Sequence, residues 1–288
     1  MTDANPLPIV NLNRFALLCI DGADAERFLQ GQLTCDVVKL ADMHWELGAC
    51  CTAKGRMVAN FVIARIGNAY WLHLPQAQAE ALKQHLSRYA VFYKTSMTLV
   101  SDHVLWGTLP AQALQVTAAG QHAVSRSDEL ITLSWPDGRC EYWGTTAPDS
   151  TSDEGWQALD IAMGVVWVNA DSHEAWVPQY IDWQDQGGIN FRKGCYTGQE
   201  IVARLQYLGK TKKHLASATA SEPLSLAVGE QLSDSDGKHI AEVASWQGQN
   251  GLVIISGEVP ANAFFGEKSV TLGQLFYTED QDSSSTPE

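Results

Sequence analysis

The 288-residue sequence predicts an α+β protein that ends in a small β-barrel or sandwich. Before residue 213, apolar runs of strand length alternate with stretches whose apolar residues recur at helical spacing. From residue 214 onward, short β-like runs alternate with Gly, Asn, Asp and Pro, which is typical of a small closed β domain. The length is sufficient for two or three domains and a sizeable core.

The part before residue 213 is expected to contain strands and a few helices. A first helix follows the turn Asp21-Gly22, is capped by Asp21 or Asp24, and ends near Gly31. Another follows Pro75, and the acidic start at 152–154 opens a further one. We also expect a short helix at 111–116 and strands at 14–20, 45–53, 57–66, 70–74, 95–100, 104–109, 130–135, 139–143 and 177–181. The C-terminal strands are expected at 215–220, 239–246, 252–256 and 270–276.

Composition narrows the class of protein. The net charge of −14 opposes general binding to phosphate backbones. There is no apolar run of membrane-spanning length and no signal-peptide pattern, so we expect a cytoplasmic protein without a membrane partner. The six cysteines form no C-x-x-C pair and no zinc spacing, and we expect neither a permanently bound metal nor disulfides. Cys50 and Cys51 should point to opposite faces of a strand, so that one of them is core.

The most informative stretch is KGCYTGQE, residues 193–200, followed by IVARL. Thr197 and Glu200 have the spacing of a capping box, which predicts a helix start immediately after Cys195. The amide groups of a helix start, with the positive charge of Lys193, favour a thiolate. A buried cysteine that fills space beside Tyr196 is an equally weighted alternative.

Basic residues gather around this stretch. They comprise Arg192, Lys193, Arg204, Lys210, Lys212, Lys213 and His214. The cluster is either an ordinary solvated face or a surface that attracts anions to an otherwise acidic protein.

Several stretches together resemble one known family. They are FLQGQLTCDV (28–37), AKGRM (53–57), WQALDI (156–161), VPQY (177–180) and, most specifically, KGCYTGQEIVAR (193–204). In these stretches the chain resembles the YgfZ family, whose members bind folate and are related to the aminomethyltransferase, or T-protein, of the glycine cleavage system. The resemblance covers residues 14–213 by motif and the C-terminal part by layout.

The resemblance implies a fold and a division of the chain. It implies a multi-subdomain ring of aminomethyltransferase type around a folate pocket, with a C-terminal β-barrel. Residues 1–213 would form two intertwined α+β subdomains and 214–278 the barrel, and the acidic tail 279–288 would be disordered.

The resemblance also implies a function. The family supports the assembly or repair of iron–sulfur clusters, including those of a tRNA-thiomethylating enzyme. By this likeness activity depends on Cys195, and its surroundings are shaped by Lys193, Gly194, Tyr196, Gly198, Gln199 and Glu200. Tetrahydrofolate or a derivative would contact Phe15 and Trp156, and its anionic tail would be attracted by Arg204, Lys210, Lys212 and Lys213.

Two departures from the related enzymes bear on catalysis. Residues 54–60 lack the carboxylate that the T-protein uses in folate chemistry, and Ala162 stands where relatives often carry a charged residue. The first departure argues against the rival hypothesis of a folate-dependent aminomethyl or one-carbon transferase. Transient contact with iron–sulfur proteins is expected, and direct binding of tRNA to the basic cluster is doubtful at this net charge.

Overall fold

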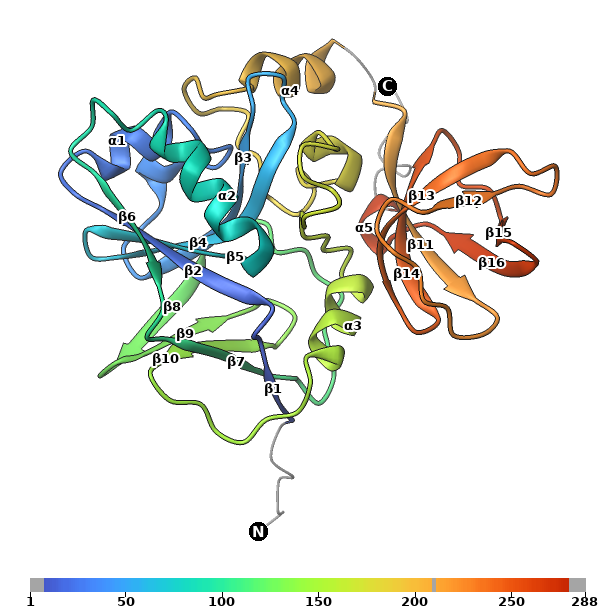
Figure 1. Cartoon of the computed structure of the whole chain (residues 1–288), viewed down its shortest axis with the longest axis horizontal. Coiled ribbons are helices and arrows are strands. Elements are labelled where there is room, and N and C mark those ends of the chain that lie inside the picture. Colours follow the sequence, from blue (N-terminus) through green and yellow to red (C-terminus); the bar gives the residue numbers. More distant parts are fainter. Residues whose placement is uncertain (1–7, 209–210, 280–288) are drawn as a thin grey trace, which may run out of the picture.

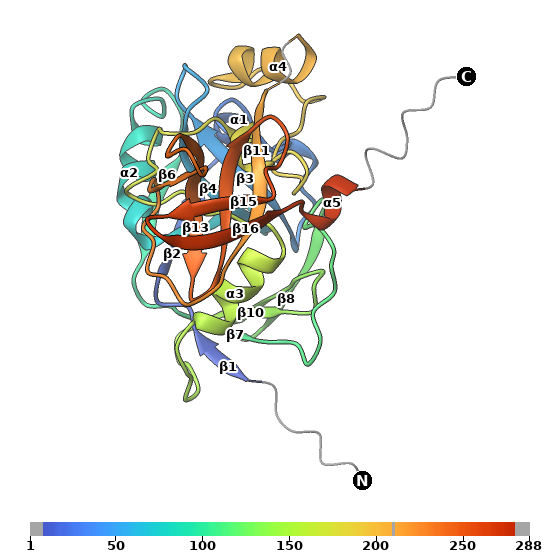
Figure 2. The same cartoon turned by 90° about the vertical axis from the view of Figure 1, so that its right-hand side faces the viewer.

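A ten-stranded sheet and a closed β-barrel form the two main parts of the protein. The computed structural model describes residues 8–208 and 211–279. The barrel lies on one side of the N-terminal part, with helix α3 (Glu154–Ala162) between them (Figures 1 and 2). Along the chain, the helices of the N-terminal part are α1 (Ala25–Gln30), α2 (Gln76–Ser87), α3 and α4 (Gln199–Tyr207), with 3₁₀ turns η1 (Val37–Lys39) and η2 (Pro178–Ile181).

The large sheet has the strand order β1-β7-β10-β9-β8-β3-β4-β5-β2-β6. Its strands are β1 (Ile9–Asn11), β2 (Phe15–Asp21), β3 (His44–Cys51), β4 (Met57–Ile66), β5 (Ala69–Pro75), β6 (Ser96–Val100), β7 (Val104–Thr108), β8 (His122–Ser127), β9 (Leu130–Ser134) and β10 (Cys140–Gly144). Every pairing between these strands is antiparallel. Strand β3 connects the group β1-β7-β10-β9-β8 to the group β4-β5-β2-β6, because it pairs with both its hairpin partner β4 and the distant strand β8.

The centre of this sheet is covered on both faces. Cys50 and Cys51 are both fully buried, but they belong to two separate apolar clusters. The expectation that they point to opposite faces therefore agrees with the structure, whereas the expectation that one alone is core is wrong. Helix α2 and the α1 segment cover one face, and the central core covers the other.

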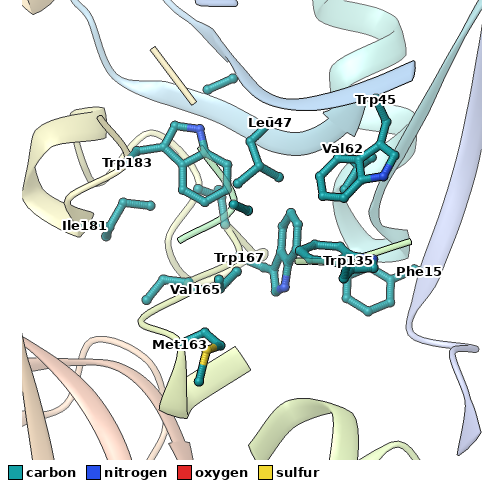
Figure 3. Packing of buried hydrophobic residues seen from close by; sticks show 14 of the residues in the cluster. Phe15, Trp45, Leu47, Val62, Trp135, Met163, Val165, Trp167, Ile181 and Trp183 are labelled. Atoms are coloured by element: carbon teal, nitrogen blue, oxygen red, sulfur yellow. The ribbon is translucent and has the colours of Figure 1, made fainter. Parts of the chain in front are cut away.

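The central core is rich in tryptophan. Figure 3 shows rings from different elements facing one another, among them Trp45, Trp135, Trp167 and Trp183. The rings of Trp45 and Trp135 have centroids 4.8 Å apart, and those of Trp167 and Trp183 are 5.9 Å apart. Large rings bury much apolar area, so this cluster ties the sheet to the irregular segment before α4.

The C-terminal part closes into a barrel with strand order β11-β14-β13-β12-β15-β16. The strands are β11 (Lys213–Ala220), β12 (Gln231–Ser233), β13 (His239–Gln247), β14 (Asn250–Ser256), β15 (Asn262–Phe265) and β16 (Lys268–Gly273), and α5 (Phe276–Glu279) follows. The barrel has its own buried cluster. Residues of β11 and β14 that face the other way, such as Leu215 and Ile254, belong to the central core instead.

Most expected elements are confirmed, and the misses have local causes. Residues 111–116 are not helical, and 178–181 form a 3₁₀ turn rather than a strand because Pro178 begins it. Four strands were not anticipated because they are short or largely polar: β1, β8, β12 and β15. Residues 280–288 of the expected tail lie outside the described residues, and no helix in the described part is long and apolar enough to cross a membrane.

Candidate functional site

The segment before α4 presents an exposed thiol between two buried side chains. Lys193 and Tyr196 are buried, whereas Cys195 is exposed. The buried alternative for this cysteine therefore does not match the structure. Two anchors within four residues hold the backbone, so the sulfur is both accessible and fixed in place.

Lys193 is anchored by backbone oxygens. Its Nζ donates to the carbonyl oxygens of Gln30 at 2.8 Å, Leu33 at 2.7 Å and Cys35 at 2.6 Å. Burial lowers the pKa of Lys193, and the three carbonyls satisfy the three protons of its ammonium group. The sequence-based expectation placed this charge beside the thiol, but the structure directs it inward, onto the loop that follows α1.

The predicted capping box is not formed. The N-cap of α4 is Gly198, without a side-chain cap, and the Thr197 hydroxyl donates instead to Oε1 of Gln32 at 3.0 Å. Glu200 is exposed in the first turn, where a carboxylate favours the helix dipole. The amide of Gln199 donates to the carbonyl of Tyr196 at 3.1 Å, so the turn closes through the backbone.

Gly198 is required by both conformation and space. Its φ is +86°, and a Cβ there would lie 2.5 Å from the carbonyl oxygen of Thr52. A Cβ on Gly55 would likewise lie 2.9 Å from Cβ of Ile201. The turn between β3 and β4 is thus packed directly on the start of α4. Gly194, by contrast, is exposed, and a Cβ there would meet no atom within 4 Å.

Four of the other cysteines lie in surroundings that disfavour a thiolate. Burial raises the pKa of Cys51 to about 12, and burial together with Asp21 raises that of Cys19 to about 11. Burial also raises the pKa of Cys35 and of Cys50. All six cysteines lie within the described residues, and Cys195 is the one classed as exposed.

The predicted anion-attracting residues differ in their surroundings. Arg204 and Lys212 are exposed. The Nζ atom of Lys213 lies 5.0 Å from the centroid of the Tyr180 ring and 3.9 Å from Oε2 of Glu242. Lys210 lies outside the described residues.

Phe15 lines a separate cleft between the N-terminal part and the barrel, which we call the Phe15 cleft. Its volume is about 300 Å³. Apolar, aromatic and polar side chains line it together: Arg14, Phe15, Pro75, Ala77, Gln157, Trp167, Asn169, Leu226, Val228, Ala244, Ser245 and Trp246. Sequence reasoning found Phe15 but missed Trp167 and Trp246, for which the high number of tryptophans was the available signal.

A buried charge network supports one wall of the Phe15 cleft. Arg14 pairs with Asp153 at 2.7 Å and with Asp160 at 2.9 Å. Asp160 also accepts from Nε1 of Trp167 at 3.0 Å and pairs with the buried Arg139 at 2.6 Å. Two cations and an indole thus surround one carboxylate, which fixes both Arg14 and Trp167 in the wall.

Behind Phe15 lies a buried histidine with unused hydrogen-bonding capacity. The rings of Phe15 and His73 have centroids 4.3 Å apart, and neither ring nitrogen of His73 has a hydrogen-bond partner among the described residues. Nε2 of His73 lies 3.3 Å from Oε1 of Glu141, whose carboxylate accepts from the indoles of Trp135 and Trp143. Burial lowers the pKa of His73 to about 3 and raises that of Glu141 to about 7.

Trp156 does not line the Phe15 cleft. Its side chain is fully buried, and the Arg139 guanidinium lies 4.6 Å from its ring centroid. A Cβ on Gly107 would lie 2.3 Å from the Trp156 ring, so strand β7 is shaped around it. Trp156 thus packs as a core anchor near the start of α3. Ala162 is exposed and lines a second cleft of about 350 Å³ between α3 and the barrel.

The segment 54–60, which lacks a carboxylate, ends in a structural amide. Asn60 is fully buried, its Nδ2 donates to the carbonyl of Val166 at 2.8 Å, and its Oδ1 accepts from the amide of Val168 at 2.8 Å. Both the Nδ2 and the Oδ1 atoms are hydrogen-bonded, so Asn60 joins strand β4 to the segment after α3.

The thiol and the Phe15 cleft are in different places. Residues of β2, β5, α2, α3 and the barrel line the cleft, whereas Cys195 precedes α4, which both views place well away from α3 (Figures 1 and 2). None of the described residues in 176–208 and 211–213 lines either cleft. The described residues contain no group of three or more His, Cys, Asp or Glu side chains that could hold a metal ion.

Comparisons with known proteins gave sequence relatives and a similar solved structure. No protein-family model matches the chain. The chain is 32% identical over 255 residues to the tRNA-modifying protein YgfZ of Shigella sonnei (strain Ss046), covering 78% of each chain. It is also 32% identical over 249 residues to the tRNA-modifying protein YgfZ of Escherichia coli O157:H7 (strain EC4115 / EHEC), covering 79% of this chain and 76% of that protein.

The similar structure is the glycine cleavage system aminomethyltransferase T from Bartonella henselae. Its TM-score is 0.73 at 13% identity, over 94% of this chain and 86% of that chain. A likeness at this identity concerns the fold. It confirms the predicted aminomethyltransferase-type fold, and the closed barrel agrees with it.

Proposed function

Because the chain belongs to the family of the tRNA-modifying protein YgfZ, with a role related to tRNA modification, we propose that it supports the assembly or repair of iron–sulfur clusters in tRNA-modifying enzymes. Cys195 is the reacting group in this proposal. The observation that carries it is the exposed thiol held between the buried side chains of Lys193 and Tyr196. The iron–sulfur protein is a transient partner, and its cluster is the substrate. The cytoplasm is the proposed location.

The exposed position of the Cys195 thiol suits a reaction with a partner protein rather than with a small molecule enclosed by this protein. An exposed sulfur at the tip of an anchored turn can reach the cluster or a cysteine of another protein. The Lys193 clamp on three carbonyls keeps the turn in place, and the Gly198 contact with Thr52 holds its other end. Gln199 and Glu200 belong to the first turn of α4 and support this arrangement.

The proposed ligand of the Phe15 cleft is tetrahydrofolate or a derivative. Cofactor sites are concave and mostly apolar, with a few placed polar groups, and the Phe15 cleft has this character at the small end of the usual volume range. Trp167 and Trp246 add aromatic surface for a flat bicyclic ring to the wall that contains Phe15, whose own ring has the Arg14 guanidinium 4.6 Å from its centroid. The Nδ1 atom of His73, behind Phe15, has no hydrogen-bond partner among the described residues and adds unused polar capacity near the wall.

Complementation tests whether the proposed function requires Cys195. Wild-type, Cys195→Ser and Cys140→Ser chains are expressed in a strain that lacks the gene, and the thiomethylated nucleosides of its tRNA are quantified by mass spectrometry. We expect Cys195→Ser to fail and Cys140→Ser, a partly exposed cysteine on β10, to restore the modification. Full restoration by Cys195→Ser would remove the cysteine from the proposal.

Titration with tetrahydrofolate, followed by tryptophan fluorescence, tests the ligand. We expect saturable binding that Phe15→Ala weakens by about tenfold or more, because the substitution removes an aromatic ring from the wall of the Phe15 cleft. Ala162→Glu is the matched control in the second cleft, and there we expect no change. Tighter binding by Ala162→Glu would place the ligand in the second cleft, and no saturable signal would refute folate binding.

A further inference from the structure

The charges of this chain are unevenly distributed. Residues 52–56 and 191–213 together contain eight of the nineteen basic residues but one of the thirty-three acidic residues, Glu200. The remainder of the sequence is therefore strongly acidic. Such a contrast generates a local positive potential that attracts anionic partners.

The fold brings these two segments together. Gly55 packs on Ile201 and Gly198 packs on Thr52, so the β3–β4 turn lies against the first turn of α4. The exposed cations Lys54, Arg192, Arg204 and Lys212 take part in none of the ion pairs found among the described residues. Their charge is thus available to a partner.

An exposed apolar end accompanies these cations. Tyr207 is 65% exposed and Leu208 is 85% exposed, at the C-terminal end of α4. The ring of Phe191 packs against that of Tyr207 with centroids 6.0 Å apart, which joins the loop before Cys195 to the end of the helix. Arg204 lies one helical turn before Leu208 and therefore on the same side of α4.

We propose that this surface, the α4 face (Lys54, Arg192, Arg204, Tyr207 and Leu208), docks an acidic protein surface with an apolar centre. Protein interfaces combine an apolar centre with a charged rim and are enriched in Tyr and Arg. A nucleic acid would be held mainly through the cations, whereas Leu208, which is 85% exposed, and Tyr207 add an apolar centre that a protein surface can cover. The inference rests on charge and exposure, and it requires neither the folate ligand nor the reaction of Cys195.

Photocrosslinking in cells tests this docking. Leu208 is replaced by p-benzoyl-phenylalanine in the full chain, expressed in place of the chromosomal copy, and adducts are resolved by mass after irradiation. The matched control carries the same group at Phe92, which is 91% exposed in the segment after α2. Three variants test the role of charge: the double variant Arg192→Glu and Arg204→Glu, the conservative Arg204→Lys, and Arg88→Glu, a charge reversal at the C-cap of α2.

The proposal requires an adduct at position 208 with a protein of acidic isoelectric point, resistant to ribonuclease and absent at position 92. The double reversal should reduce this adduct by about tenfold or more, because it replaces the positive charges that attract an acidic partner with negative ones. Arg204→Lys and Arg88→Glu should leave the amount of adduct unchanged. A ribonuclease-sensitive adduct, an adduct of two copies of this chain, or no adduct above the control would each overturn the proposal. An adduct insensitive to the double reversal would do the same. Complementation by Cys195→Ser bears on the cysteine alone, so the two proposals can fail separately.

Discussion

Asp182 offers a direct test of how a buried carboxyl limits stability. It follows η2 and is 3% exposed, and its Oδ2 accepts from the amide of Leu215 at 3.1 Å. Burial and, secondarily, the neighbouring Asp185 raise its pKa from 3.8 to about 8. Asp182→Asn keeps an acceptor for Leu215 and tolerates the left-handed backbone at φ 48°, but it removes the titration.

The direction in which stability changes with pH follows from the raised pKa of Asp182. Below pH 4 the carboxyl is protonated in both states, so it contributes its full stability there. As the pH rises from 4 to 8, the unfolded state ionises first and the folded protein loses stability. At pH 7 the loss amounts to at most about 4 kcal/mol, from about 1.4 kcal/mol for each pKa unit between 3.8 and 7. We therefore expect Asp182→Asn to gain stability over wild type by up to this amount.

Urea unfolding at pH 5, 6, 7 and 8 measures this difference. Glu46 and Glu141, whose pKa values burial raises to about 7, are present in both proteins, so their effects cancel in the comparison. Glu222→Gln, which removes an exposed carboxylate paired with Lys268, serves as the control and should give a difference that hardly varies with pH. A difference for Asp182→Asn that stays constant from pH 5 to pH 8 would refute the reasoning.

Three further substitutions probe the candidate site. Lys193→Met leaves three buried carbonyls unsatisfied and should cost about 2–4 kcal/mol in urea unfolding, whereas Arg192→Met, at an exposed position, should stay within about 0.5 kcal/mol. Gly198→Ala introduces a Cβ 2.5 Å from a backbone oxygen at φ +86° and should cost about 1–3 kcal/mol, whereas Gly194→Ala meets no atom and should change the free energy of unfolding little. Trp156→Ala should cost about 3–5 kcal/mol as a core truncation, and a Trp156→Phe protein that loses folate affinity without losing stability would contradict the core-anchor role.

The local parts of the site were predictable from sequence, because they depend on neighbours in the chain. The turn before α4, its glycine and the helix that follows were all expected from residues 193–205. The partners of those residues were not. Lys193 was assigned to the thiol because sequence spacing cannot reveal the three carbonyls of another loop. The capping box failed for the same reason, since Thr197 found a side-chain partner outside the helix.

The Phe15 cleft could not be predicted, because it depends on docking of the barrel. Its walls come from β2, the start of α2, α3 and the barrel, and no local pattern links these elements. Trp156 illustrates the difficulty. A tryptophan near a helix start is compatible with both a ligand contact and a core anchor, and only the packing of Gly107 against its ring separates the two.

The separation of the thiol and the Phe15 cleft constrains how a folate would act in this protein. A ligand in the cleft contacts both the N-terminal part and the barrel, because residues of each form its walls. Binding there would stabilise the docked arrangement of the two parts by mass action. Cys195 lies before α4 and outside that cleft, so the thiol has no reacting atom of such a ligand beside it. Any influence of the ligand on Cys195 would have to pass through the contacts that join the barrel to α4, such as Asp182 with Leu215 and Gln179 with the carbonyl of Val202. A folate is therefore better suited to report or stabilise a conformation of this protein than to exchange a group with its cysteine.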